Sequence, residues 1–378
     1  MSDVLPYARQ SVDESDVAAV ARAVTDPYLT TGPAVTRFEA DLAGWTGGNP
    51  AVAVTSGTAA LHTAYAAAGV GPGQDVVTTP FTFVATAATA ALLGARVVFA
   101  DVEEATGCLD PAAAAAAVTP RTTVVTAVDY AGAPADMDAL RQVADGAGAL
   151  LLEDAAHSIG TTWRGRPVGA LADLTTLSFF ATKNLTTAEG GAVVSTSPDL
   201  LARAAGFRNH GLVRDPARQR WPDEGPWHQE VHSFGLNYRL PDVLCALGSS
   251  QLRRLPAFIA RRAELSARYD AALADVAEVT LPSRPHDADV AWHLYPARVP
   301  EEARRALFEH LRAAGVGVQV NYVPAHWHPV FADLGYRRGE FPVAERWYRQ
   351  ELSLPLFVGL GDADVDRVCD LVRGFFSG

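Results

Sequence analysis

Between about residue 50 and residue 200, short runs of β-branched residues alternate with alanine-rich segments. The runs predict buried strands, and intervening segments such as TAALHTAYAAAG and DMDALRQVADGAG predict helices. Strands that alternate with helices are joined by crossover connections, which make neighbouring strands parallel. The expected strands are AVAVTS, DVVTTP, ARVVFADV, TTVVTAVDY, ALLLEDAA, TTLSFF and GAVVST. The sequence therefore predicts an α/β fold on a mostly parallel central sheet.

The pattern changes after Leu240, where PDVLCALGSSQLRRLPAFIARRAELSARYDAALADV indicates long helices with arginines on their outer faces. Two strand candidates, AWHLYPARV and GVGVQVNYV, flank a helix in EEARRALFEHLRAAG, and DADVDRVCDLVRGFF predicts a last helix. We expect a large domain over residues 1–245 and a smaller C-terminal α+β domain over residues 246–378.

Composition excludes several functional classes. The chain has 378 residues, of which 49% are hydrophobic and 20% charged, as in an ordinary soluble enzyme. Its net charge of −12 argues against general nucleic-acid binding, which needs a basic face. We find no signal-like start and no apolar run long enough to span a membrane. The three cysteines, Cys108, Cys245 and Cys369, have no metal or redox spacing, so we expect a cytoplasmic protein.

Lys183, in the stretch SFFATKNLTTAEGGAVVS, is the only lysine in the chain, because the other thirty of the 31 basic residues are arginines. An arginine stays protonated, whereas a desolvated lysine amine can lose its proton and attack a carbonyl. Apolar, strand-like residues flank Lys183 on both sides. This setting favours covalent catalysis over a leftover surface residue.

Other candidate groups follow the ends of the predicted strands, where ligands bind in open α/β sheets. Thr55-Ser56-Gly57-Thr58 leads from the first strand into a helix, and could form a phosphate cradle or an ordinary helix cap. Phe83 follows the second strand and could stack on a flat ring or pack in the core. Asp154 ends the fifth strand, where a buried acid needs a partner. Ser178 precedes Lys183 by five residues.

Together these groups match the needs of pyridoxal 5′-phosphate. This cofactor requires a lysine for its aldehyde, an acid for its ring nitrogen, donors for its phosphate and a flat neighbour for its ring. Each motif alone is a weak signal, but the ordered set predicts this cofactor.

The stretches TSGTAALH, EDAAHSIG, SFFATKNLTTAEGGAV and GLNYRLPDVLCALGSSQL resemble the DegT/StrS-type sugar aminotransferases, which are fold-type I pyridoxal-phosphate enzymes. The resemblance covers almost the whole chain. It extends to the UDP-sugar 4-transaminases of the pseudaminic-acid type in LPYARQS, YLTTGPAV, GPWHQEVHSFGLNYRL and GVGVQVNYVPAHWHPVFADLGYRRGEFP. It implies a fold-type I transferase that moves an amino group, from L-glutamate, to the C4 keto group of a nucleotide-linked deoxysugar.

The resemblance also implies roles for individual residues. Lys183 matches the Schiff-base lysine, Asp154 the partner of the pyridinium nitrogen, and His157 a residue beside the phenolic oxygen of the cofactor. Phosphate contacts are implied for Gly57, Thr58 and Ser178, and ring stacking for Phe83. Asn237 matches an asparagine that reaches the phosphate of the neighbouring subunit, which implies a homodimer with shared active sites. The candidates for the nucleotide-sugar side are Tyr7, Thr31, Arg239, Tyr322 and His326.

The sequence departs from the family pattern at two places beside these motifs. Asn321 stands before Tyr322 where the family more often has histidine, and Phe180-Ala181-Thr182 stands before the lysine where pseudaminic-type enzymes carry His-Pro. Some candidates also have plain structural readings: Tyr7 and Tyr322 as interface aromatics, and Arg239 as an ion-pair partner of Asp242.

The sequence also bears on other functions. Family dehydratases carry histidine at the lysine position, so Lys183 favours amino transfer over dehydration. A transaminase of a cyclitol or another keto compound, and a homologue that binds the cofactor without transamination, remain alternatives. The glycine run at Gly69–Gly73 follows a helix and precedes a strand, the reverse of the dinucleotide fingerprint. His326 and His328 with His293 lack a nearby acid cluster, so we expect no metal site.

Overall fold

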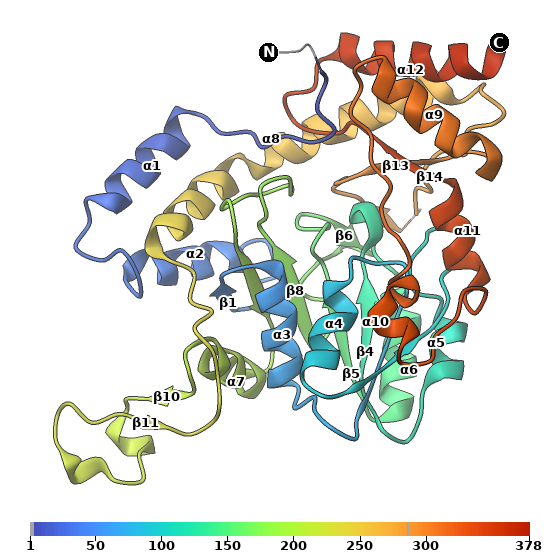
Figure 1. The fold of residues 1–378 in the computed structure, drawn as a ribbon. Helices are drawn as coiled ribbons and strands as arrows, with labels where there is room; N and C mark the ends of the chain where they lie inside the picture. Colours follow the sequence, from blue (N-terminus) through green and yellow to red (C-terminus); the bar gives the residue numbers. More distant parts are fainter. Residues whose placement is uncertain (1–3, 286) are drawn as a thin grey trace.

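The computed structural model describes residues 4–285 and 287–378 (Figure 1). Its centre is a seven-stranded sheet with the strand order β1-β9-β8-β5-β4-β2-β3. The strands are β1 (Ala51–Val54), β2 (Asp75–Thr78), β3 (Arg96–Phe99), β4 (Thr122–Val128), β5 (Leu150–Asp154), β8 (Leu174–Ser178) and β9 (Gly191–Val194). All seven strands expected from the sequence are present, and only β9 runs antiparallel to its neighbours. The mostly parallel α/β sheet is thus confirmed.

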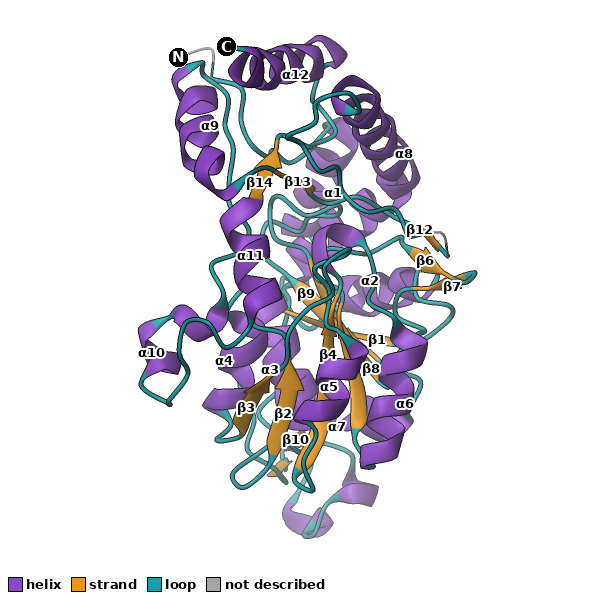
Figure 2. Ribbon diagram, turned by 90° about the vertical axis from the view of Figure 1, so that its right-hand side faces the viewer, coloured by secondary structure: helices purple, strands orange, loops and turns teal. Residues whose placement is uncertain are grey.

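Helices cover both faces of this sheet (Figures 1 and 2). The helices of the first two thirds of the chain are α1 (Glu14–Val24), α2 (Pro33–Ala43), α3 (Gly57–Ala67), α4 (Ala85–Leu92), α5 (Pro111–Ala117), α6 (Met137–Ala147) and α7 (Pro198–Arg208). The alanine run of α5 is a helix whose Asp110 side chain accepts the N–H of Ala112 at 2.8 Å, as its Asp-Pro start predicts.

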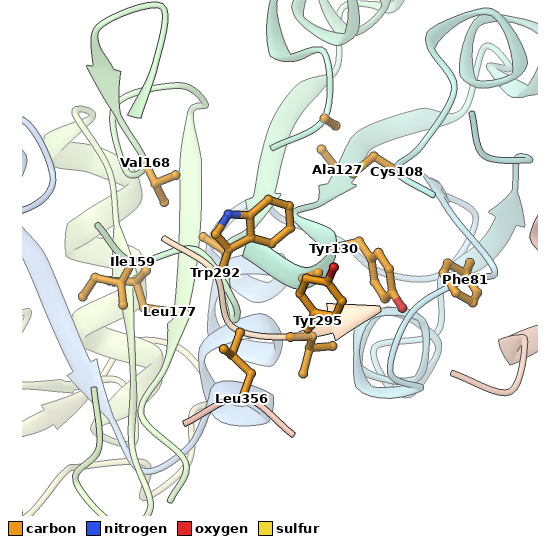
Figure 3. Packing of buried hydrophobic residues seen from close by; sticks show 14 of the residues in the cluster. Phe81, Cys108, Ala127, Tyr130, Ile159, Val168, Leu177, Trp292, Tyr295 and Leu356 are labelled. Carbon is orange, nitrogen blue, oxygen red and sulfur yellow. The ribbon is translucent and has the colours of Figure 1, made fainter. Parts of the chain in front are cut away.

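Successive strand residues point to opposite faces, so each strand contributes to two apolar layers. On β5, Leu152 packs in the layer under α3, α4 and α7, whereas Leu151 packs in the layer under α2, α5 and α6. The second layer continues into the C-terminal part of the chain, and Figure 3 shows Tyr130, Leu177, Trp292 and Leu356 in it. A strand buried on both faces must be apolar throughout, which explains why the strand sequences do not alternate.

The C-terminal part begins with one long helix, α8 (Asp242–Leu273), where the sequence suggested several. It crosses residue 245, the domain boundary expected from the sequence, and contacts α1 and α2 as well as α12. The other elements are β13 (Tyr295–Arg298), β14 (Glu351–Leu354), α9 (Glu301–Ala313), α10 (Pro329–Ala332), α11 (Pro342–Gln350) and α12 (Asp362–Ser377). The division into two domains at residue 245 stays a prediction.

One predicted strand is wrong. GVGVQVNYV forms no strand, and β13 pairs instead with β14, whose sequence ELSL was not expected as a strand. The segment makes only isolated bridges, between Leu5 and Val316 and between Gln319 and Ser353. After Gln319, the side chains of Glu351 and Tyr130 instead form hydrogen bonds with the backbone of Asn321.

The smaller strands lie at the margins. A three-stranded sheet joins β12 (Ala288–Asp289), β6 (Thr162–Trp163) and β7 (Arg166–Pro167). A separate hairpin of β10 (Leu212–Val213) and β11 (Glu230–Val231) extends away from the body of the molecule, at the lower left of Figure 1. Among the described residues, no helix combines the length and the apolar character needed to cross a membrane.

Candidate functional site

A cavity of about 510 Å³ lies beyond the carboxyl ends of the parallel strands, where an open α/β sheet places its ligands. Chain segments that lie far apart in the sequence line it together. The predicted site residues that line it are Tyr7, Gly57, Thr58, Phe83, Asp154, His157, Ser178, Lys183 and Tyr322.

Lys183 lies in the loop after β8, in a turn closed by its own N–H to the carbonyl of Phe180 at 3.0 Å. Burial lowers the pKa of Lys183 to about 8, and the charge of Asp154 opposes this shift. A lower pKa raises the fraction of neutral amine, the form that attacks a carbonyl. The geometry therefore gives the only lysine a nucleophilic character.

Asp154 ends β5 and is only 4% exposed. Its Oδ2 accepts the hydroxyl of Thr86 at 2.7 Å, and its Oδ1 accepts the N–H of Ala156 at 3.3 Å. Burial raises the pKa of Asp154, while those two donors and the charge of Lys183 lower it. A buried carboxylate with only neutral donors in direct contact retains capacity for a cationic partner.

The amino end of α3 faces the cavity beside Ser178. The Ser56 side chain caps the helix by accepting the N–H of Ala59 at 3.0 Å, while Gly57 and Thr58 line the cavity. A Cβ atom at Gly57 would lie 2.8 Å from the Cβ of Ser178, closer than two carbons can pack. Glycine therefore leaves free backbone amides and a hydroxyl together at a helix start, an arrangement that suits an anion.

His157 and two aromatic residues form another wall. The Tyr322 hydroxyl lies 3.1 Å from Nε2 of His157, and its ring centroid lies 5.9 Å from that of Phe83. Burial, together with the charge of Lys183, shifts the pKa of His157 well below its ordinary value, so the imidazole is neutral. Phe83 is 57% exposed, which leaves its ring free for contact with a flat ligand.

Tyr7 reaches the cavity because the N-terminal segment pairs with the C-terminal part. Leu5 exchanges backbone hydrogen bonds with Gly315 and Gly317, at 2.9 and 2.8 Å. A Cβ at Gly317 would lie 2.6 Å from the backbone nitrogen of Tyr7, so this close approach requires glycine.

Four predicted residues do not line the cavity of this chain: Thr31, Asn237, Arg239 and His326. Thr31 is exposed before α2, and Asn237 is exposed on the segment that returns from the β10–β11 hairpin. Arg239 donates to Oδ1 of Asn209 at 2.7 Å. Its alternative reading as a partner of Asp242 is wrong, because Asp242 accepts the N–H groups of Gly32 and Ala34.

His326 lies outside the cavity, and a contact between it and the substrate stays a prediction. His326 is 1% exposed, and its Nε2 lies 3.0 Å from a carboxylate oxygen of Glu345. Its ring packs on Phe341, with 4.8 Å between centroids. A buried acid 19 residues later in the chain is thus the partner of Nε2 of His326.

The cavity also contains residues that the sequence reasoning did not assign to the cofactor site. These are Thr86, which donates to Asp154, His293, whose ring centroid is 4.5 Å from that of His157, and Asn321. Thr86 was detectable as a polar residue in the alanine-rich segment after PFTF. His293 had been considered only as a metal ligand, and Asn321 only as a departure from a family pattern.

The residues present fit pyridoxal 5′-phosphate. One cavity holds an amine of lowered pKa, a buried acid with neutral donors, and a glycine-dependent anion cradle. His157 also has a buried Nδ1 without a hydrogen-bond partner among the described residues. Lys183 would hold the cofactor covalently, and Asp154 would face its ring nitrogen.

Comparisons with known proteins agree with this assignment. The profile of the DegT/DnrJ/EryC1/StrS aminotransferase family matches residues 10–373. The spore coat polysaccharide biosynthesis protein SpsC of Bacillus subtilis is 38% identical over 99% of this chain and 97% of its own length.

Solved structures with the same fold include two with a TM-score of 0.93. One is the putative sugar aminotransferase Spr1654 from Streptococcus pneumoniae in its PMP-form, 27% identical and covering 99% of each chain. The other is Helicobacter pylori PseC, an aminotransferase involved in the biosynthesis of pseudoaminic acid, 29% identical and covering 99% of this chain and 100% of its own. The chain therefore belongs to the DegT/DnrJ/EryC1/StrS aminotransferase family, and it is a sugar aminotransferase of fold type I that uses pyridoxal phosphate.

Proposed function

We propose that this enzyme transfers an amino group from L-glutamate to the C4 keto group of a nucleotide-linked deoxysugar, in the cytoplasm and in ping-pong order. The observation that carries this proposal is that one cavity is lined by the only lysine, whose pKa is lowered to about 8 by burial, together with Asp154, Phe83 and Tyr322. The similarity to PseC and to SpsC, a polysaccharide biosynthesis protein, supports an acceptor that is a sugar.

Each residue has a defined task in this proposal. When bound, pyridoxal phosphate supplies an electron-poor ring that stabilises negative charge on the reacting carbon. In the donor half-reaction, free Nζ of Lys183 would take the proton from the donor carbon and pass it to the cofactor carbon that receives the nitrogen. In the acceptor half-reaction it would move a proton from that carbon to the sugar carbon. Asp154 would place its charge beside the ring nitrogen. His157, which is neutral and contacts the Tyr322 hydroxyl, would lie beside the phenolic oxygen.

The acceptor sugar would bind above these groups. Tyr7 and Tyr322 are the proposed contacts from the same chain, and both present phenol groups at the cavity. Thr31 and Arg239 are proposed to reach the nucleotide from the neighbouring subunit, since neither lines the cavity of its own chain.

The experiment that tests the proposal follows the absorption of the loaded enzyme. L-glutamate should convert the band of the lysine-bound cofactor to that of the amino form, and a UDP-4-keto-6-deoxyhexose should restore it. If glutamate leaves the band unchanged, the donor is wrong. If a keto-cyclitol restores the band and the nucleotide sugar does not, the acceptor is wrong.

We further propose a homodimer with shared active sites. Support comes from the segment around the β10–β11 hairpin, which leaves large apolar side chains in solvent: Phe234 is 98% exposed and Trp227 79%. Exposed apolar clusters of this kind mark interaction surfaces. Asn237 follows Phe234 on the same segment. We propose that a second copy of the chain covers this segment, and that Asn237 then reaches the start of α3 in that copy, where Gly57 and Thr58 would bind the phosphate.

Mixing two inactive variants should restore activity if the sites are shared. Lys183→Ala removes the lysine of its own site, and Asn237→Asp puts a negative charge beside the phosphate of the partner's site. A mixed dimer then contains one intact site, so random assortment gives roughly one quarter of wild-type activity. Each variant incubated alone is the control. Activity that stays at the sum of the two controls after subunit exchange contradicts the shared site.

Gly57→Ala should weaken cofactor binding at least about tenfold, because the added Cβ must displace Ser178 or α3. The measurement is the cofactor dissociation constant, from absorbance titration of the apoenzyme. Gly146→Ala is the matched control, since a Cβ at Gly146, in helix α6, meets nothing within 4 Å. Equal affinities for the two variants would show that the cradle does not depend on this close approach.

A further inference from the structure

A buried acid outside the cavity accepts a hydrogen bond from the chain segment that carries Tyr322, one of the aromatic residues that line the cavity. Glu351, the first residue of β14, is fully buried. Its Oε2 accepts the backbone N–H of Asn321 at 2.7 Å, and its Oε1 accepts the hydroxyl of Ser353. Within the described residues it takes part in no salt bridge, so these neutral donors carry its interactions.

The bonded segment has no regular structure of its own. Gln319 makes an isolated bridge with Ser353, but residues 320–322 belong to no helix or strand, so no ladder of backbone hydrogen bonds fixes them. Side chains bond both backbone groups of Asn321 instead, since its N–H donates to Glu351 and its carbonyl accepts the Tyr130 hydroxyl at 2.7 Å. A buried irregular segment depends on such bonds for a single conformation.

The Asn321 side chain extends this network to Tyr7. Its Nδ2 donates to the Tyr7 hydroxyl oxygen at 2.7 Å and to Oγ of Ser353 at 3.1 Å. Ser353 in turn donates to Glu351, so the carboxylate fixes both the backbone and the side-chain amide of Asn321. The next residue is Tyr322, whose hydroxyl meets His157.

We propose that Glu351 is a positioning residue for the acceptor sugar, acting through Asn321 on the orientation of Tyr7 and Tyr322. Glu351 does not line the cavity, and it touches neither Lys183 nor Asp154. Its loss is therefore expected to disturb the acceptor half-reaction more than the donor half-reaction, which it reaches only through the contact of Tyr322 with His157. The inference rests on the proposed function, because it takes the two tyrosines as sugar contacts.

Two substitutions show whether Glu351 orients residues of the cavity or only stabilises the fold. Glu351→Leu removes both acceptor oxygens, whereas Glu351→Gln keeps a carbonyl for the Asn321 N–H and can donate to Ser353. Glu345→Leu is the matched control, because Glu345 is also a buried glutamate with neutral and charged donors but bonds His326 outside the cavity. All three variants are compared as loaded enzyme after their melting temperatures have been measured.

The first readout is hydrogen exchange of the backbone amides in residues 316–323, which needs no substrate. We expect exchange at least about tenfold faster in Glu351→Leu, near wild type in Glu351→Gln, and unchanged in Glu345→Leu, since one buried hydrogen bond is worth about that factor. Unchanged exchange in Glu351→Leu would overturn the inference.

The second readout is the split between the half-reactions. For Glu351→Leu we expect the KM for a UDP-4-keto-6-deoxyhexose to rise about tenfold or more, while the rate of the glutamate half-reaction changes less than about threefold. Equal losses in both half-reactions, or a KM that does not change, would also overturn the inference.

A separate variant, Tyr7→Phe, distinguishes a failure of the Glu351 inference from a failure of the proposed function. If Tyr7→Phe leaves the KM for the sugar unchanged, or if the wild type does not accept the sugar at all, the proposed acceptor site is wrong. In that case the exchange measurement still decides whether Glu351 holds residues 320–322.

Discussion

Lys183→Arg is expected to abolish turnover, lowering kcat by at least about 10⁴-fold, because arginine keeps the positive charge but supplies neither a nucleophilic amine nor a base that can accept the substrate proton. The protein should stay folded, since a long cationic side chain still occupies the partly buried position after β8. The measurements are steady-state amino transfer and the absorption spectrum of the loaded variant.

Because the chain contains one lysine, chemical labelling provides a control for this experiment. Borohydride reduction fixes the cofactor to the lysine that holds it, and Lys183 is the only lysine present. Wild type should therefore gain one equivalent of stable label, and Lys183→Arg should gain none. A variant that keeps normal turnover, or that is labelled at another side chain, would falsify the assignment of Lys183.

Asp154→Asn is expected to lower kcat by about 10²–10³-fold, because the change removes the charge beside the ring nitrogen and keeps the shape. Asparagine can still accept the Thr86 hydroxyl, so the geometry around β5 should persist. Burial raises the pKa of Asp154, which means that the folded protein holds this charge at a cost. The free energy of unfolding of the apoenzyme should consequently not fall in the variant.

Thr86→Val is the control for this prediction. It removes the 2.7 Å hydrogen bond to Asp154 and leaves the charge in place, so a loss of only about tenfold in kcat is expected. The two variants are compared by single-turnover kinetics with L-glutamate. Equal losses would mean that the orientation of the carboxylate matters, and its charge does not.

Much of the cofactor site was predictable because it lies at the ends of strands that the sequence marks clearly. Asp154 and Ser178 each end a buried apolar run, and Gly57 opens the helix that follows β1. Parallel strands bring their carboxyl ends to one edge of the sheet, so local position along the chain was enough to bring these residues together.

The acceptor side was less predictable because its residues come from distant and irregular segments. Tyr7 depends on the pairing of Leu5 with Gly315 and Gly317. Tyr322 follows Asn321, whose backbone N–H donates to Glu351. The segment GVGVQVNYV has the β-branched alternation of a strand, yet β13 takes β14 as its partner. Choice of partner is a property of the folded chain, and no local pattern encodes it.

The sequence by itself determined the α/β class, the lysine–acid pair and the family of this protein. These features depend on residue type and short spacing, which persist whatever the chain does elsewhere. Only the tertiary structure decided that His326 is buried against Glu345 and that Glu351 accepts the backbone N–H of Asn321. The physical reason is that a polar side chain is defined by the partner it meets on burial, and both partners lie 19 or more residues away along the chain.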